Sequence, residues 1–205
     1  MRYIAISIFL LVLTCVPLFA QDQVASTGDE AVVKERHARM LELAKSYTLT
    51  AEKDAQVKLR ETPIFAWSTP ERQALGGELY LWTSDGRPLA RIGIWTYDDI
   101  KDSHELQSLS TGPLRAEAES GFRWRPTVGG LAFKKLEGAP APDNSAVRRQ
   151  TQMRSLLRER FGAELIKREN GQLEKLRLLP QPIYRYDPLP PGVDDGAVFA
   201  FALGT

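Results

Sequence analysis

The segment Ser103–Ser110, SHELQSLS, places a histidine and a glutamate among three serines. These residue types could form a hydrolytic site, because a serine nucleophile needs a histidine base and an acid that orients the base. An extended chain rises about 3.3 Å per residue, so His104 and Ser108 on one strand face lie about 13 Å apart. Glu105 points to the other face. The segment is therefore predicted to be a polar strand, and His104 and Glu105 are its candidates for catalysis.

The acidic residues permit a second kind of hydrolase, in which two carboxylates act as acid and base on a glycosidic bond. The chain contains 26 acidic residues, and its four tryptophans could stack on sugar rings. Aromatic residues in strands are, however, more often core residues and cross-strand partners. A glycosidase-like, carboxylate-dependent hydrolase is therefore the alternative function. The function that we favour from the sequence is a non-catalytic domain that binds a ligand or a partner.

Residues 145–161 have the apolar spacing of an amphipathic helix and carry five arginines against a single acid, Glu159. Arg149 and Arg160 fall inside its apolar arc. A guanidinium near a core must meet a carboxylate, a carbonyl or a bound anion, because an unpaired buried charge is prohibitive. The pattern thus predicts either an ion pair with an acid on the sheet or an anion site, and Arg149 and Arg160 are the candidate ligand-binding residues. The arc itself comprises Ala146, Val147, Met153, Leu156, Leu157 and Phe161.

Residues 1–20 are typical of a secretory signal peptide. Arg2 supplies the positive start, an uncharged apolar run follows, and Ala20 is a small residue at the expected cleavage position. The protein is therefore expected to be secreted or periplasmic. Cys15 offers an alternative, attachment of a lipid anchor, although Thr14 before it fits a lipoprotein signal poorly.

Cleavage after residue 20 changes the composition of the chain. It removes the only cysteine and one of the 27 basic residues, so that 26 basic residues remain against 26 acidic ones. A cysteine-free chain with two histidines excludes thiol nucleophiles, thiolate zinc sites and three-histidine zinc centres. Nucleotide-binding and nucleophile-elbow motifs are absent from the sequence. We therefore expect no metal site, no cofactor and no nucleic-acid partner, since the last needs a basic field. No apolar stretch after residue 20 is long enough for an integral membrane segment.

The order of apolar patterns predicts an α+β fold on a mainly antiparallel sheet. The clearest element is a hairpin over residues 78–97, where two apolar runs flank Asp85-Gly86, a pair that favours the positive φ angles of a tight turn. SHELQSLS follows as a third strand of the meander, near an edge. Residues 129–136, GGLAFKKL, are a further strand candidate.

Two helices are expected to pack on this sheet, one beginning near Asp29 and one over residues 145–161. Residues 21–28 are polar and are expected to form a disordered leader of the mature chain. About 185 residues suit one domain of ordinary size, so residues 29–205 are predicted to form a single α+β domain.

Several motifs occur in one order along the chain: WTSDGRP, HELQSLSTGPL, W-x-P at Trp124–Pro126, R-x-x-Q-M-R at Arg149–Arg154, LRLLPQPIYRY and DGAVFAF. With them the chain resembles a group of uncharacterised secreted bacterial proteins, over roughly residues 67 to 205. The resemblance implies one exported domain and carries no activity and no site residues. It also implies that the natural chain continues past Gly204-Thr205.

Overall fold

The computed structural model describes residues 3–13, 27–51, 56–69, 74–97, 101–167 and 170–203; for residues 3–13, 27–30, 68–69, 74–75, 97 and 101 it describes the backbone only. The chain divides into two compact units. We call Phe19–Ala132 the meander unit, and Met1–Leu18 together with Phe133–Thr205 the terminal unit. Two helices and mostly antiparallel sheets confirm the predicted α+β class. That residues 29–205 form one domain stays a prediction.

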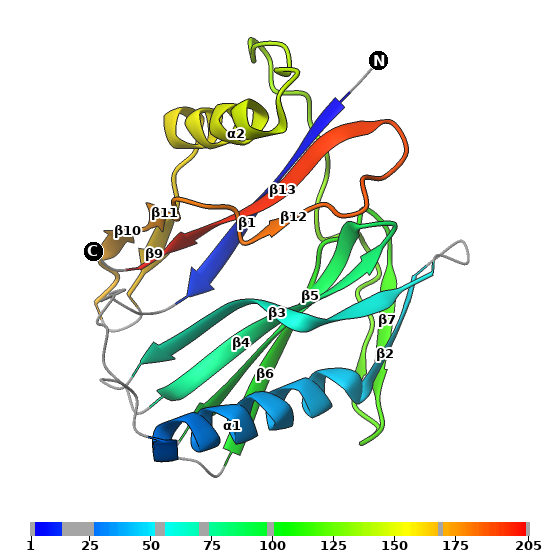
Figure 1. Ribbon diagram of the computed structural model, residues 1–205, viewed down its shortest axis with the longest axis vertical. Coiled ribbons are helices and arrows are strands. Elements are labelled where there is room, and N and C mark those ends of the chain that lie inside the picture. Colours follow the sequence, from blue (N-terminus) through cyan, green and yellow to red (C-terminus); the bar gives the residue numbers. More distant parts are fainter. Residues whose placement is uncertain are drawn as a thin grey trace. The chain divides into compact units, whose positions relative to one another are not determined.

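Four antiparallel strands form the main sheet of the meander unit (Figure 1). Their order follows the sequence: β3 (Lys58–Thr69), β4 (Ala74–Ser84), β5 (Arg87–Tyr97) and β6 (Lys101–Ser108). The predicted hairpin is confirmed, because β4 and β5 are joined by Asp85 and Gly86 with φ angles of 47° and 73°. The predicted polar strand is also confirmed, as β6 pairs with β5 at the edge of the sheet.

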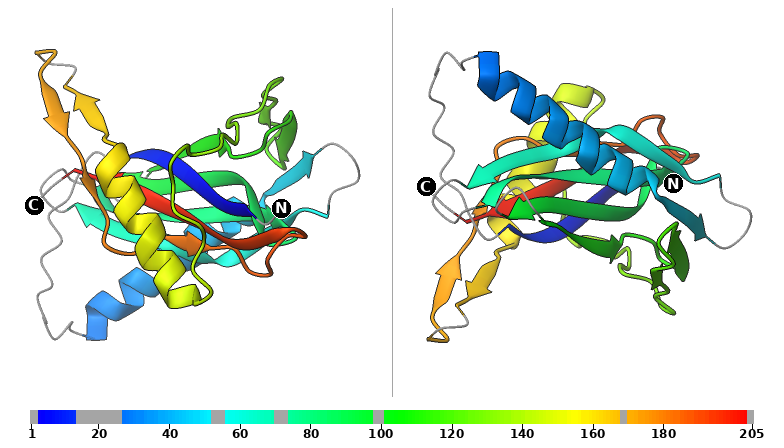
Figure 2. Two further views of the ribbon diagram at one scale, coloured as in Figure 1. Left: turned by 90° about the horizontal axis from the view of Figure 1, so that it is seen from above. Right: turned by 90° about the horizontal axis from the view of Figure 1, so that it is seen from below.

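Helix α1 (Thr27–Lys45) lies across one face of this sheet (Figure 2). Met40 and Ala44 are fully buried and belong to one apolar cluster with Tyr80, Ile92 and Ile94 of the sheet. Burial of a methionine side chain such as that of Met40 stabilises the fold by about 1.5–3 kcal/mol. This packing of the helix on the sheet confirms the predicted position of the N-terminal helix.

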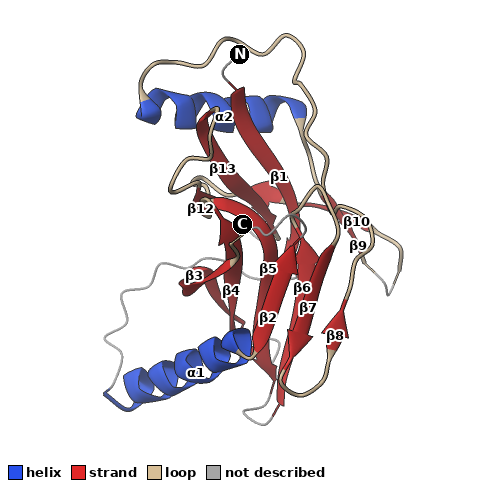
Figure 3. Ribbon diagram, turned by 90° about the vertical axis from the view of Figure 1, so that its right-hand side faces the viewer, coloured by secondary structure: helices blue, strands red, loops and turns tan. Residues whose placement is uncertain are grey.

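A smaller sheet of the same unit consists of β2 (Tyr47–Ala51), β7 (Leu114–Ala118) and β8 (Arg123–Trp124) (Figure 3). The strand predicted at residues 129–136 is wrong, because these residues form an irregular segment. Its Gly130 N–H donates to the Ser110 carbonyl at 2.9 Å. A Cβ atom at Gly130 would lie 2.0 Å from the Ser108 carbonyl oxygen, so the glycine permits a close backbone approach.

Strand β13 (Val193–Ala202) is the centre of the terminal unit. Strand β1 (Tyr3–Leu13) runs parallel to it along one edge (Figure 1). Strands β11 (Arg177–Leu178) and β12 (Tyr184–Arg185) pair with it in antiparallel orientation. Residues 196–203 are all buried, as an uninterrupted apolar run predicts for a strand covered on both faces.

Helix α2 (Ala146–Arg160) packs on β13, where Met153 and Leu157 meet Ala197 and Phe199. The apolar contact begins at Met153, and Val147 before it is 74% exposed. Ala146 is exposed as well, so the predicted places of these two residues in the buried arc are wrong. The hairpin of β9 (Glu164–Ile166) and β10 (Leu173–Lys175) extends away from β13 (Figure 2).

Strand β1 is formed by part of the predicted signal peptide. The expected cleavage position after Ala20, Cys15 and residues 21–26 of the expected leader 21–28 lie outside the described residues. The last two residues of that expected leader, Thr27 and Gly28, belong to helix α1. Cleavage, export and lipid attachment therefore stay predictions. Within the described ranges, no helix combines the length and the apolar character needed to cross a membrane.

Candidate functional site: two arginines on a buried aspartate

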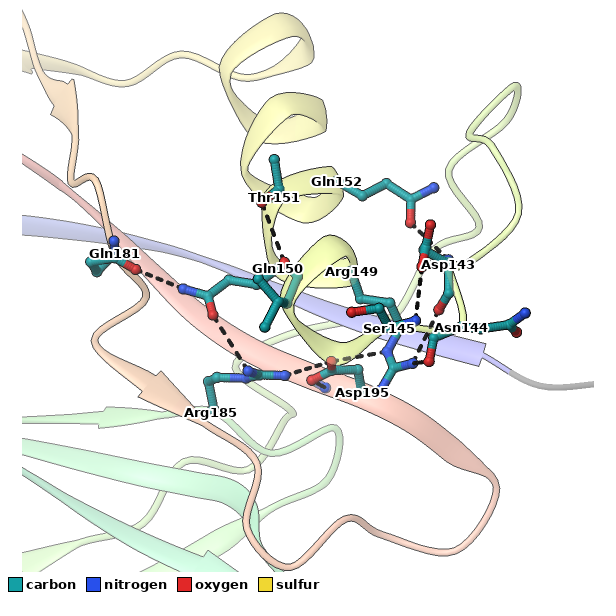
Figure 4. Close-up of polar contacts among 12 residues, drawn as sticks. Asp143, Asn144, Ser145, Arg149, Gln150, Thr151, Gln152, Gln181, Arg185 and Asp195 are labelled. Carbon is teal, nitrogen blue, oxygen red and sulfur yellow. Dashed lines mark hydrogen bonds and ion pairs between the residues drawn. The ribbon is translucent and has the colours of Figure 1, made fainter.

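Asp195 is the acceptor of a polar cluster between α2, β12 and β13 (Figure 4). Its side chain is only 3% exposed. The Oδ2 atom accepts hydrogen bonds from Arg149 Nε at 3.0 Å and from Arg185 Nη2 at 2.6 Å. The Oδ1 atom accepts the Gly196 backbone N–H at 2.9 Å. We call Arg149, Arg185 and Asp195 the arginine–aspartate cluster.

Arg149 is 15% exposed, which confirms the prediction that it is buried and paired. Its partner is a protein carboxylate on the sheet, one of the two alternatives that the sequence left open. Its Nη1 atom also donates to the carbonyl oxygens of Asp143 and Asn144, both at 3.0 Å. Arg149 thus joins the segment before α2 to β13.

Arg185 is the more accessible arginine of the cluster, with 36% of its side chain exposed. Its Nη1 atom donates to the Gln150 side-chain oxygen at 3.4 Å, and the Gln150 amide donates to the Gln181 side chain at 2.7 Å (Figure 4). The cluster holds two guanidinium groups against one carboxylate. These three side chains together therefore carry a surplus positive charge next to the amide groups of Gln150 and Gln181.

Arg160 lies at the other end of α2, eleven residues or about 16 Å along the helix from Arg149. It is exposed, so its predicted position inside the buried arc is wrong. Its guanidinium donates to the carbonyl oxygens of Glu137 at 2.5 Å and Gly138 at 3.1 Å. The structure therefore does not bring the two sequence-predicted arginines together.

Sequence reasoning missed Arg185 and the acid that it contacts. Asp194-Asp195 directly precedes the apolar run of residues 196–203, and an acid at that position is a signal that could have indicated a buried partner for Arg149. Arg185 offers no such signal, because its contact with Asp195 depends on how β12 pairs with β13.

His104 and Glu105 point to opposite faces of β6, as predicted, and each contacts a different residue. The Tyr47 hydroxyl and Nε2 of His104 are hydrogen-bonded at 2.5 Å. Burial lowers the pKa of His104 and raises the pKa of Tyr47. Glu105 accepts from the buried Arg91 at 3.1 Å. The two catalytic candidates are therefore not assembled into one site.

The lowered pKa of His104 predicts that stability decreases in mild acid. The His104 ring binds a proton more readily in the unfolded chain than in the folded one. The neutral ring therefore contributes fully to the free energy of unfolding above the ordinary pKa of 6.5, and this contribution is lost as the pH falls from there towards the folded-state pKa. The loss is expected to be at most about 1.4 kcal/mol per pH unit. Urea unfolding at several pH values should show a flatter profile for His104→Gln than for the wild-type protein. Equal slopes for wild type and His104→Gln would contradict this expectation.

A carboxylate–histidine pair between α1 and β4 also escaped the sequence analysis. Nδ1 of His37 lies 2.9 and 3.0 Å from the two Glu78 oxygens, and the Tyr80 hydroxyl donates to the same carboxylate. The pKa of Tyr80 is raised, mainly because its hydroxyl is buried and to a smaller extent because the hydroxyl donates to Glu78. The Glu78 side chain is 14% exposed and that of His37 is 40% exposed, so the histidine ring is oriented by an acid and reaches solvent.

Metal ligands do not converge in the described ranges, where no three His, Cys, Asp or Glu side chains are placed to hold an ion. Comparison with protein-family models, with curated proteins and with solved structures finds no match to this chain. The function must therefore be argued from the geometry of the clusters themselves.

Proposed function

We propose that the protein is exported and that it binds an anionic ligand without transforming it. The observation that carries this proposal is the sharing of one buried carboxylate by two guanidinium groups. Asp195 already accepts three hydrogen bonds, and arginine does not give up its proton in proteins. The cluster therefore offers no acid or base, whereas its surplus charge favours the binding of a carboxylate or phosphate group.

The accessible part of the cluster defines where such a ligand would bind. Arg185 is the partly exposed cation, and Gln150 and Gln181 add amide donors beside it. Arg149 is held by carbonyl oxygens and by Asp195, so we assign it to positioning the carboxylate. The apolar start of the chain supports export of this binding domain.

Thermal unfolding with added anions tests the proposal. Sulfate, phosphate or citrate is expected to raise the melting temperature of the protein at constant ionic strength, because a ligand that binds only the folded state stabilises it. Arg185→Gln should abolish this increase. Arg148→Gln is the matched control, since Arg148 lies on the same helix with 78% of its side chain exposed, and it should keep the increase. An equal response of wild type and Arg185→Gln would refute the anion site.

A second candidate function is hydrolysis with carboxylate groups, and the Glu78–His37 pair is the observation that favours it. An acid that orients a partly exposed histidine is a recurring arrangement in general acid–base sites. Turnover of a glycoside panel by the wild-type protein, and its loss in Glu78→Gln, would favour this function over binding alone.

A further inference from the structure

We infer that the exported protein binds an extended apolar segment of a partner protein, which adds as a parallel strand to the open edge of β13. This inference goes beyond the proposed anion binding and rests on the proposed export of the protein. A signal peptide is removed during export, and β1 lies entirely within the expected signal peptide. The strand that covers this edge of β13 in the full chain is then absent from the processed protein.

The pairing of β13 shows which of its backbone groups lose their partner. The carbonyl oxygens of Gly196, Val198 and Ala200 accept hydrogen bonds from the segment that contains β11 and β12. Backbone groups of successive residues in a strand point to alternate edges. The N–H and C=O groups of Ala197, Phe199 and Phe201 therefore point to the edge that β1 covers.

The sequence of β13 does not protect this edge. Natural edge strands avoid unwanted pairing by charged side chains, proline, bulges or a covering segment. Residues 196–203, which follow Asp195, contain neither a charged residue nor proline. A long apolar strand with one free edge needs a covering strand to satisfy its backbone groups.

The strand β1 identifies the chemistry of the segment that fits. Its sequence YIAISIFLLVL contains no charge, and it runs parallel to β13 with partners from Tyr3↔Val193 to Leu13↔Ala202. Addition of a strand to a sheet edge derives its affinity from main-chain hydrogen bonds. A two-fold related second copy of β13 would instead pair in antiparallel orientation. The parallel seating of β1 therefore favours a segment of another protein.

The register also predicts which peptide amides carry the binding. In a parallel pair, a residue bonds to the two neighbours of its partner. Ser7 and Phe9 lie opposite Val198 and Ala200, so their backbone groups face Ala197, Phe199 and Phe201. The backbone groups of Ile6 and Ile8 point away from β13.

Peptides with the sequence of residues 3–13, made soluble by added lysines, provide the test. The complete chain, with residues 1–20 included, is expressed. The exported and processed form is purified, and its N-terminus is sequenced. The unmodified peptide is expected to bind and to slow amide hydrogen exchange at Ala197, Phe199 and Phe201. N-methylation at Ser7 and Phe9 should weaken binding by about five- to 140-fold, since the two lost hydrogen bonds together cost about 1–3 kcal/mol and 1.4 kcal/mol is a factor of ten. N-methylation at Ile6 and Ile8 should leave binding unchanged.

Each other outcome overturns the inference. Equal binding of the two N-methylated peptides would show apolar adhesion without strand addition. A processed protein that is dimeric, with these three amides already protected and no peptide binding, would show that a second copy covers the edge. An N-terminus that retains residues 3–13 would show that β1 still covers the edge and would overturn this inference together with the expected cleavage. The anion site would not be affected by that result, because the anion experiment tests it separately.

Discussion

Asp195→Ala is expected to lower the free energy of unfolding by about 3–5 kcal/mol, the range for removal of one partner from a buried ion pair. The substitution leaves the guanidinium of Arg149, which is 15% exposed, without a carboxylate. It also removes the acceptor of the Gly196 N–H. Urea unfolding of the purified variant measures the loss, and Glu159→Ala, which removes an exposed acid on α2, is the control with an expected change within about 0.5 kcal/mol.

Two further variants separate the effect of uncompensated charge from that of lost contacts. Arg149→Ala is expected to cost less, about 1–3 kcal/mol, because Arg185 still pairs with Asp195. Joint replacement by Arg149→Met, Arg185→Met and Asp195→Leu should recover part of the stability lost in Asp195→Ala, since apolar residues often replace buried ion pairs at little cost. A triple variant that is less stable than Asp195→Ala would contradict this account of the cluster.

Gly130→Ala is expected to destabilise the meander unit by about 3 kcal/mol, at the upper end of the usual cost of overpacking. The new Cβ atom would lie 2.0 Å from the Ser108 carbonyl oxygen, which belongs to the backbone at the end of β6 and cannot rotate away. The segment would have to move off the strand and lose the hydrogen bonds that Gly130 and Leu131 donate to the Ser110 carbonyl.

Gly162→Ala is the matched control for this prediction. Apart from the two neighbouring residues in the chain, no residue has an atom within 4 Å of the Cβ position there, so the substitution should be neutral or should stabilise the protein by about 0.4–1 kcal/mol. Urea unfolding compares the two variants, and hydrogen exchange of the β6 amides reports the local change. Similar free energies of unfolding for the two variants would contradict the prediction, because they would show that residues 129–136 can move away from β6 without a loss of stability.

Local chemistry in the sequence determined the elements that depend on neighbouring residues. Asp85-Gly86 between two apolar runs determined the β4–β5 hairpin, because only a few residue types tolerate positive φ angles. Alternation along SHELQSLS determined that His104 and Glu105 point to opposite faces of β6. The composition of the 145–161 segment determined that it forms a helix and that Arg149 needs a partner.

Tertiary structure alone decided which partners these residues meet. Asp195 lies 46 residues from Arg149, and Glu78 lies 41 residues from His37, so no local pattern links either pair. The close approach of the Gly130 backbone to the Ser108 carbonyl was also not predicted from the sequence, because the pattern of residues 129–136 favoured a strand. Hydrophobic periodicity and turn propensity act over a few residues and fix the elements, whereas the pairing of charges and of closely packed backbones depends on how distant elements pack against each other.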